Sequence, residues 1–369
     1  MKIILAPDKF KGSMTAEEAA SIEKEAILSI LPEAQVICVP LADGGEGTVR
    51  ALTAANGGTL FREKVRGPLG KSVEALLGTA GDTAFLEMAE ASGLTLLAPE
   101  ERDPMKTSTY GTGELILSVL RRGIKKIIIG IGGSATVDGG TGMAEALGYR
   151  FFDREGHLIS PLCGGVLEQI DTIDCSLAEP LLKEAQICIA SDVTNPLLGE
   201  NGAVAVFAPQ KGATLQMMPQ LEEGLANLRN VLKKQNMLPE DLPGDGAAGG
   251  LGLGLRAFCH AHSESGAQLA ISASGLEEKL KDADLLITGE GCSDAQTDNG
   301  KLCAVVAETC RKHHIPCILL SGKILGENFP LFYKTAATVP ADACFEEIKP
   351  RARELLKEAA RELIRELEM

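Results

Sequence analysis

The sequence predicts an α/β protein in which both ends of the chain share one parallel sheet and a second α/β domain is inserted between them. Two observations predict this fold class. Short apolar runs alternate with helical segments at both ends of the chain, which is the pattern of β-α-β units. Most Gly-rich polar segments directly follow an apolar run, as loops at the ends of strands do.

The length of the chain fits two domains. At ~150 residues per domain, 369 residues predict two, with three as the alternative. We place one domain at residues 1–75 and 280–369 and the inserted domain at residues 76–279. The active site is expected in the cleft between them, because ligands of open parallel sheets bind at the carboxyl ends of the strands.

The N-terminal region predicts the first β-α-β unit. Residues 3–6 form a short apolar strand. Thr15 and Glu18 have the spacing of a capping box, so a helix is expected from there to about Leu31, which a proline follows. A second strand is expected over residues 35–39, parallel to the first.

The C-terminal third repeats this order of elements. We expect a buried strand at 283–288, a polar loop at 289–300, a helix at 302–313, a strand at 315–320 and an amphipathic outer helix at 345–367. The middle of the chain predicts strands at 83–88 and 124–129, a helix at 112–122 that stops at Gly123, and apolar stretches at 181–190 and 203–208.

Charge and composition exclude several classes of partner. The net charge is −15, no basic tract is present and Trp is absent, so neither nucleic acid nor an anionic membrane is expected as a partner. No apolar run approaches the ~18 residues of a membrane span, and the first one is too short for a signal peptide. Ten scattered cysteines without a CxxC pair indicate free thiols in a reducing compartment. We therefore expect a cytoplasmic protein, with a homo-oligomer as an open alternative.

A Gly-rich segment directly follows the strand predicted to end at residue 129. Gly132, Gly133 and Ser134 would let backbone N–H groups approach a phosphate, and a helix expected from Gly142 would offer its positive end. A close turn between strand and helix is the alternative. The segment also matches Gly-x-Gly-x-x-Ala, with Asp153 after a further apolar run, so an NAD(P)-dependent dehydrogenase of small hydroxy acids stays open.

Two other glycine motifs are weaker. Residues 244–250 match Gly-x-Gly-x-x-Gly but follow a Pro-rich loop instead of a strand. Gly249 and Gly250 are candidates for backbone contact with a substrate or phosphate, and a helix-packing turn is an equal alternative. Residues 67–72 resemble the end of a Walker A motif, but only two residues separate the glycines, fewer than that motif requires, so we expect an ordinary turn.

Carboxylates at strand ends are candidates for Mg²⁺ binding and for general base catalysis, and turn formation is the alternative for each. They follow predicted strands in three places: Asp43 with Gly44 and Gly45, Asp192 with Asn195, and Glu290 with Asp294. Lysines occur in similar loops: Lys9, Lys11, Lys211 and Lys301. Phosphoryl transfer needs such a combination of glycine loops, carboxylates and cations. A non-catalytic protein that binds a small anion is the remaining alternative.

Several of these motifs carry a resemblance to a known family. The segments are 6–13, 40–48, 111–116, 132–140, 192–196, 206–213, 246–252, and 287–291 with Asp294, Gln296, Thr297, Gly300 and Lys301. In this order, along nearly the whole chain, they resemble the type 1 glycerate kinase family of bacteria. Two positions depart from the family, which often has a basic residue at Cys292 and a Ser at Lys9.

The resemblance implies a two-domain α/β kinase with one Rossmann-like domain built from both chain ends. Such an enzyme uses ATP and Mg²⁺ to phosphorylate D-glycerate, typically to 2-phosphoglycerate, in organic acid or glyoxylate catabolism. With this activity, Asp192, Lys9 and Lys11 are the expected catalytic residues, Asp192 taking the proton of the glycerate hydroxyl. Glu290 and Asp294 are expected to bind Mg²⁺. The expected substrate and phosphate contacts are Asp43, Gly44, Gly45, Gly132, Gly133, Ser134, Asn195, Lys211, Gly249 and Gly250.

Overall fold

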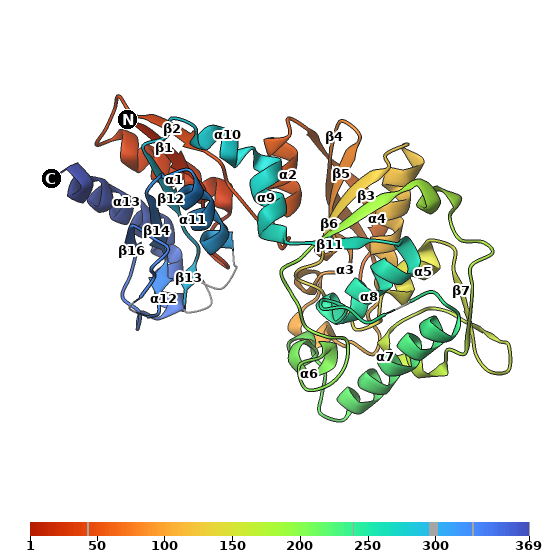
Figure 1. The fold of residues 1–369 in the computed structure, drawn as a ribbon. Helices are drawn as coiled ribbons and strands as arrows, with labels where there is room; N and C mark the ends of the chain where they lie inside the picture. The colour runs from red at the N-terminus through yellow and green to blue at the C-terminus, as the bar shows by residue number, and fades with distance from the viewer. Residues whose placement is uncertain (43, 239, 295–301, 327, 369) are drawn as a thin grey trace. The chain divides into compact units, whose positions relative to one another are not determined.

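The computed structural model describes residues 1–42, 44–238, 240–294, 302–326 and 328–368. The chain forms two compact units, each described by itself below (Figure 1). The first contains Met1–Asp43, Ala54–Asn56 and Ser265–Met369, and the second contains Gly44–Thr53 and Gly57–Glu264. The domain boundaries expected near residues 75 and 280 differ from the edges of these units. The division of the chain into domains at those two boundaries stays a prediction.

A five-stranded parallel sheet forms the centre of the first unit, with the order β16-β14-β12-β1-β2. Its strands are β1 (Lys2–Leu5), β2 (Gln35–Cys38), β12 (Leu285–Thr288), β14 (Cys317–Ser321) and β16 (Lys334–Ala337). Ile4 of β1 lies opposite Ile37 on one side and Leu286 on the other. Both ends of the chain therefore share one parallel sheet, which confirms the predicted fold class. A small parallel pair consists of β13 (Cys292–Ser293), which follows β12 in the sequence, and β15 (Lys323–Ile324), which follows β14.

Helices cover both faces of this sheet. They are α1 (Ala16–Leu28), α9 (Gly266–Ser274), α10 (Leu276–Leu280), α11 (Leu302–Lys312), α12 (Phe345–Ile348) and α13 (Ala352–Glu368). Ile3 and Leu5 share an apolar core with α1 and α13, whereas Ile4 shares a second core with α9, α10 and α11. Side chains of a strand alternate between faces, so the unit has three α/β/α layers. The predicted capping box of α1 is confirmed, with Thr15 N donating to Glu18 Oε2 at 3.0 Å and Glu18 N to Thr15 Oγ1 at 3.2 Å.

The single helix expected over residues 345–367 is wrong. α12 ends at Ile348, Lys349–Arg351 form a 3₁₀ turn, and α13 follows. Pro350 has no N–H to donate to the preceding helical turn, and its ring crowds that turn, so the α-helical hydrogen bonding is interrupted here.

The second unit contains a six-stranded sheet with the order β11-β10-β6-β5-β4-β3. Its strands are β3 (Thr59–Arg66), β4 (Ser72–Ala80), β5 (Thr83–Glu87), β6 (Lys126–Gly130), β10 (Gln186–Ala190) and β11 (His262–Glu264). β5, β6, β10 and β11 pair in parallel, whereas β4 is antiparallel to both β3 and β5. The turn expected at residues 67–72 is confirmed, since it joins β3 to β4. A separate sheet contains β7 (Arg150–Phe152), β8 (Leu158–Ile159) and β9 (Thr172–Asp174) in the order β8-β7-β9.

One large apolar core holds the second unit together. The helices outside the first unit are α3 (Ala89–Ser92), α4 (Tyr110–Arg121), α5 (Thr141–Ala146), α6 (Ala203–Phe207), α7 (Met217–Lys234) and α8 (Ala247–Cys259), while α2 (Thr48–Ala55) contains residues of both units. Leu, Ile, Val and Ala supply most of this core. Gly123, the predicted stop of α4, has a left-handed φ of +82°.

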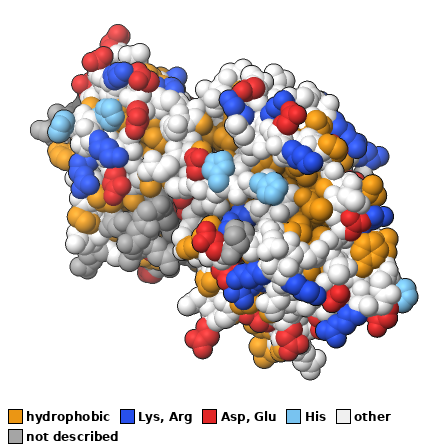
Figure 2. All heavy atoms as spheres, turned by 45° about the vertical axis from the view of Figure 1, so that its right-hand side comes forward, with side chains coloured by type: hydrophobic (Ala, Val, Ile, Leu, Met, Phe, Trp, Pro, Cys, Tyr) orange, Lys and Arg blue, Asp and Glu red, His pale blue; other side chains and the backbone are white. Residues whose placement is uncertain are grey.

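The distribution of charge, the state of the cysteines and the polarity of the helices can be compared with the expectations from composition. Figure 2 shows acidic and basic side chains interspersed over one face of the molecule. All ten cysteines are free thiols, and five of them are buried. Within the described ranges, every helix is too short or too polar to cross a membrane.

Candidate functional site

In the second unit, a glycine segment lies against the carboxyl ends of β6 and β10. A Cβ atom added to Gly44 would lie 2.2 Å from the carbonyl oxygen of Ala190, and one added to Gly130 would lie 2.4 Å from the carbonyl oxygen of Gly44. Gly132 N donates to that same Gly44 oxygen at 3.3 Å. A Cβ on Gly132 would also lie 2.9 Å from Gly45 Cα. The structure therefore brings Gly44, Gly45 and Gly132 together, in a space that only glycine backbone can fill.

Lys211 ends the 3₁₀ turn Pro209–Lys211 after α6, and its side chain is buried against the loop that follows β6. It is 1% exposed, and its Nζ donates to Ser134 Oγ and to the carbonyl oxygen of Thr136, both at 2.7 Å. Burial lowers the pKa of Lys211 to about 7, and the negative charge of Asp138 opposes this shift only in part. A lysine with this pKa loses its proton more easily than an ordinary lysine does. A bound anion would favour the protonated, charged form. Among the described residues, Thr136 Oγ1 is buried with no hydrogen-bond partner.

Asp138 is a buried carboxylate next to this lysine, and it is not among the site residues predicted from the sequence. Thr109 donates to Asp138 Oδ2 through both its N–H and its Oγ1, at 2.7 Å each. Gly140 N and Gly142 N donate to the carboxylate at 3.2 and 3.3 Å. Burial raises the pKa of Asp138, and these hydrogen bonds lower it again in part. Asp138 thus occupies two N–H groups at the start of α5, near which an anion site was expected, and that expectation stays a prediction.

Three residues at the start of α8 have left-handed backbone conformations. They are Ala248, Gly249 and Gly250, with φ values of +54°, +70° and +88°. A Cβ on Gly249 would lie 2.0 Å from the carbonyl oxygen of Thr136, and Gly139 N donates to the Gly249 oxygen at 3.1 Å. The Gly249–Gly250 turn thus packs directly on the loop that contains Ser134 and Thr136.

The loop after β10 carries Asp192 and Asn195. Asn195 is fixed from both ends, since its carbonyl oxygen accepts from Gly244 N and Gly246 N at 3.2 and 3.1 Å, and its Nδ2 donates to the Asn201 oxygen at 2.9 Å. Asp192 is exposed at the start of this loop. Ser191 Oγ accepts from Val193 N at 3.2 Å, so a neighbouring side chain makes the local turn bond.

The predicted site residues of the first unit occupy the loops after β1 and β12. Asp8 N donates to the Gly289 oxygen at 2.8 Å, and a Cβ on Gly291 would lie 3.0 Å from Lys11 N. Lys9 Nζ lies 3.8 Å from Asp8 Oδ1, and Lys11 is exposed. Backbone contacts thus join the loop that carries Lys9 and Lys11 to the loop that carries Glu290. Their action in one cleft with the site residues of the second unit stays a prediction.

The loop after β12 offers donors suited to Mg²⁺. Glu290 and Asp294 are partly exposed carboxylates, and Ser293 Oγ donates to Glu290 Oε1 at 3.1 Å. Mg²⁺ in phosphoryl-transfer enzymes is held by one or two carboxylates together with phosphate oxygens, so this pair fits the ion. Asp43, Gln296, Thr297, Gly300 and Lys301 lie outside the described residues. The described residues also contain two three-ligand groups elsewhere: Cys188 with His262 and Glu264, and Asp153 with Glu155 and His157.

The dinucleotide-binding alternative fails on topology. That fingerprint requires the strand after the glycine loop to lie in the same sheet as the strand before it. β7, which precedes Asp153, pairs instead with β8 and β9 in the separate sheet. A dehydrogenase of small hydroxy acids is therefore not favoured.

Comparison with known proteins agrees with this geometry. The sequence profile described as "Glycerate kinase family" matches residues 3–368. The chain is 47% identical to "Glycerate 2-kinase" of Escherichia coli (strain K12), over 88% of this chain and 86% of that protein. It is 41% identical to "Glycerate kinase" of Bacillus subtilis (strain 168), over 98% and 97%. The crystal structure of a putative glycerate kinase 2 from Salmonella typhimurium LT2 superposes with a TM-score of 0.86 at 42% identity, covering 100% of this chain and 98% of that one. Together with the buried lysine and the glycine loops, these matches show that the chain is an enzyme of the glycerate kinase family.

Proposed function

We propose that the enzyme transfers the terminal phosphate of ATP to a hydroxyl of D-glycerate, with Mg²⁺, and gives 2-phosphoglycerate. The hydroxyl oxygen forms a bond to the γ-phosphorus, the bond from that phosphorus to the bridging oxygen breaks, and ADP leaves. The observation that carries the proposal is the buried Lys211, whose Nζ donates to Ser134 Oγ in the segment that also contains Gly132 and Gly133. A cation held in place away from water interacts more strongly with an anionic group than a solvated lysine does.

The residue roles in this proposal follow from their chemistry. Asp192, exposed at the end of β10, takes the proton that the glycerate hydroxyl loses. Lys9 and Lys11 contact an anionic group of a substrate. Glu290 and Asp294 bind Mg²⁺, which would neutralise phosphate charge. The remaining contacts to substrate or phosphate come from Asp43, Gly44, Gly45, Gly132, Gly133, Ser134, Asn195, Lys211, Gly249 and Gly250.

Product and setting are part of the same proposal. The name of the Escherichia coli relative, "Glycerate 2-kinase", supports transfer to the 2-hydroxyl. Ten free thiols are compatible with work in the cytoplasm, and the reaction suits organic acid or glyoxylate catabolism. A coupled assay of ADP release with D-glycerate, with other hydroxy acids and with no acceptor tests the activity, and ³¹P NMR of the product identifies the phosphorylated hydroxyl. ADP release that does not depend on D-glycerate would contradict the proposal.

Removal of divalent metal should abolish turnover. Excess EDTA is expected to stop D-glycerate-dependent ADP release, and Mg²⁺ should restore it, because the transferred phosphate carries charge that the ion neutralises. Glu290→Gln should raise the Mg²⁺ concentration needed for half-maximal rate by ~10-fold or more, as lost metal contacts usually do. Glu308→Gln, on the exposed face of α11, is the matched control. Full turnover in excess EDTA, or equal Mg²⁺ dependence of both variants, would argue against this metal site.

Gly133 provides a test of the glycine loop. Gly133→Ala and Gly123→Ala both place a side chain at a left-handed φ, +75° and +82°, so each should lower the free energy of unfolding by ~1–2 kcal/mol. A Cβ on Gly133 meets only Ala89 Cβ at 3.3 Å, so the fold tolerates it. Only Gly133→Ala should raise KM for an anionic substrate, by ~10–100-fold, because the added methyl blocks hydrogen bonds to charged groups. Equal kinetics of the two variants would remove Gly133 from the site.

A further inference from the structure

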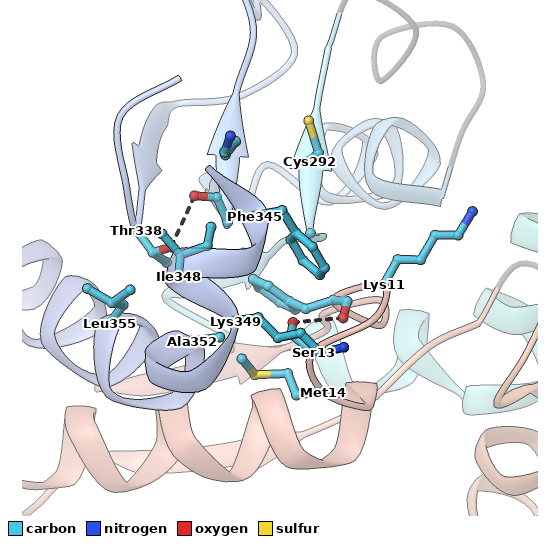
Figure 3. Close-up of a pocket in the computed structure, with 14 residues that line it drawn as sticks. Lys11, Ser13, Met14, Cys292, Thr338, Phe345, Ile348, Lys349, Ala352 and Leu355 are labelled. Atoms are coloured by element: carbon cyan, nitrogen blue, oxygen red, sulfur yellow. Dashed lines mark hydrogen bonds between the residues drawn. The ribbon is translucent and has the colours of Figure 1, made fainter. Parts of the chain in front are cut away.

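A cavity of about 380 Å³ opens at one edge of the sheet of the first unit. Its walls come from the segments that follow β1, β12, β14 and β16 and from the segment of α12 and α13 (Figure 3). All of these elements belong to the first unit. None of the residues assigned to the site in the second unit takes part in it.

The cavity lies where the strand order of this sheet reverses. From β1 the chain passes to β2 on one side, whereas β12, β14 and β16 follow one another on the other side. In an open α/β sheet with this order, the crevice at the carboxyl ends of the two strands beside the reversal is the place that receives a ligand. Phe10 and Lys11 after β1, and Gly291 and Cys292 after β12, all line the cavity. Its position is therefore that of a ligand site.

The interior of the cavity is apolar, with two aromatic rings. Phe10 and Met14 contribute from the first loop, and Phe345 and Ile348 contribute from α12. Phe345 is 41% exposed, and a Cβ on Gly12 would lie 3.1 Å from its ring, so the ring rests against the first loop and keeps an open face. Figure 3 shows Phe345 directed toward the side chains of that loop.

The hydroxyl groups of the lining are already engaged by the backbone. Ser13 Oγ donates to the Phe10 oxygen at 2.9 Å, and Thr338 Oγ1 donates to the Gly322 oxygen at 3.0 Å (Figure 3). Neither hydroxyl needs a ligand to satisfy it. The walls therefore favour a flat apolar group that stacks over one that must be hydrogen-bonded from many sides.

Cationic groups border this apolar interior. Lys11, Lys323 and Lys349 all line the cavity. Lys349 Nζ lies 5.8 Å from the centre of the Phe345 ring, and Lys323 Nζ donates to the Ala343 oxygen just before α12. Lys11 extends away from the apolar side chains, as Figure 3 shows, and is exposed. A ligand with a flat aromatic part and attached negative charge matches both features.

We propose that this cavity binds the purine base of the nucleotide substrate, with the base against Phe345 and its phosphates directed toward Lys11. The inference rests on the proposed use of ATP and adds to it the place where the base binds. Stacking on an aromatic ring is available to every base, so the site would bind the base by shape and contact area.

Binding measurements with three probes test this subsite. The probes are ADP, adenosine, which has no phosphate, and tripolyphosphate, which has no base; titration calorimetry measures each on the full chain. Phe345→Ala should weaken ADP and adenosine binding about tenfold and leave tripolyphosphate binding unchanged, because one stacking partner is lost. Ala352→Phe fills the cavity from α13 and should abolish detectable adenosine binding. Tyr333→Ala removes another exposed ring of the same unit, 71% exposed and outside the cavity, and should match the wild type.

The outcomes separate this inference from the proposed function. If the wild type turns over D-glycerate and binds ADP, but Phe345→Ala and Ala352→Phe bind adenosine and ADP as it does, the subsite is wrong and the kinase activity stands. If the wild type neither binds ADP nor releases it in the presence of D-glycerate, the proposed function itself fails. Circular dichroism of both variants tests whether they are folded. Phe345 is 41% exposed and belongs to none of the apolar cores, so its truncation should not open the core.

Discussion

Asp192→Asn should lower kcat for D-glycerate phosphorylation by ~10²–10⁴-fold, the range expected when a general base is removed. Asparagine keeps the size and the turn preference of aspartate but does not accept a proton at neutral pH. Asp192 is exposed at the end of β10, where Pro196 and the hydrogen bonds of Asn195 fix the loop. The free energy of unfolding should therefore change little. Steady-state kinetics with thermal unfolding of the same samples gives both quantities.

Ser191→Ala is the control for the alternative that Asp192 only shapes the turn. It removes the hydroxyl that accepts from Val193 N and leaves the carboxylate in place. We expect a stability loss of ~0.5–1.5 kcal/mol with kcat near the wild-type value. If Asp192→Asn instead retained kcat within about threefold and lost stability as Ser191→Ala does, the proton-accepting role would be excluded.

Lys211→Met should lower kcat/KM by ~10²–10³-fold, as loss of one preorganised charged donor does. Methionine has a similar length and lacks the ammonium group that donates to Ser134 Oγ and the Thr136 oxygen. Lys234→Met, on the exposed face of α7, is the matched control and should retain full activity. A folded Lys211→Met enzyme with wild-type kcat/KM would show that this lysine is purely structural.

The pH dependence of Lys211 gives the same assignment a second readout. Its pKa is lowered from 10.5 to about 7 by burial, so the folded protein loses this proton at lower pH than the unfolded chain does. Between these two values the unfolded state binds more protons, and this lysine therefore makes stability rise with pH over that window. The ammonium form that attracts an anion declines over the same range, so kcat/KM should fall as pH rises through about 7. The difference in unfolding free energy between the wild type and Lys211→Met, measured as a function of pH, should show the rise in stability. A pH profile of kcat/KM that is flat around pH 7 would contradict the expected fall in kcat/KM.

The parallel sheet of the first unit could be predicted because its strands are buried on both faces. β1, β12 and β14 are continuous apolar runs, and such runs next to helical segments indicate a parallel sheet. The hairpin of β3 and β4 was not predicted. β3 is an edge strand with charged, largely exposed residues, so its sequence lacks the apolar alternation that marks a half-buried strand.

In the candidate site, too, features of the local sequence could be predicted and contacts between distant residues could not. Glycines and lysines in loops after strands could be predicted as candidates because their position after an apolar run is visible in the local sequence. The burial of Asp138 could not be predicted from the sequence. Its main hydrogen-bond partner is Thr109, and the two residues meet only in the folded unit. The burial of Lys211 against Ser134 is also a contact between distant positions, 77 residues apart. Local pattern cannot place such pairs, although the shift in the pKa of Lys211 depends on them.

The first unit is assembled from strands that leave the ribosome far apart in time. Lys2 and Asp284, which join β1 to the start of β12, are 282 residues apart. At a synthesis rate of ~5–20 residues per second, β1 waits on the order of tens of seconds for this neighbour, while most of the second unit, Gly57–Glu264, is already complete. During that interval the nascent β1–α1–β2 segment has an unpaired apolar strand edge, which is the kind of surface that chaperones bind and that aggregates. A truncation before β12 would therefore leave the earliest synthesised strand without this neighbour, and it would affect the first residues of the chain as much as the last.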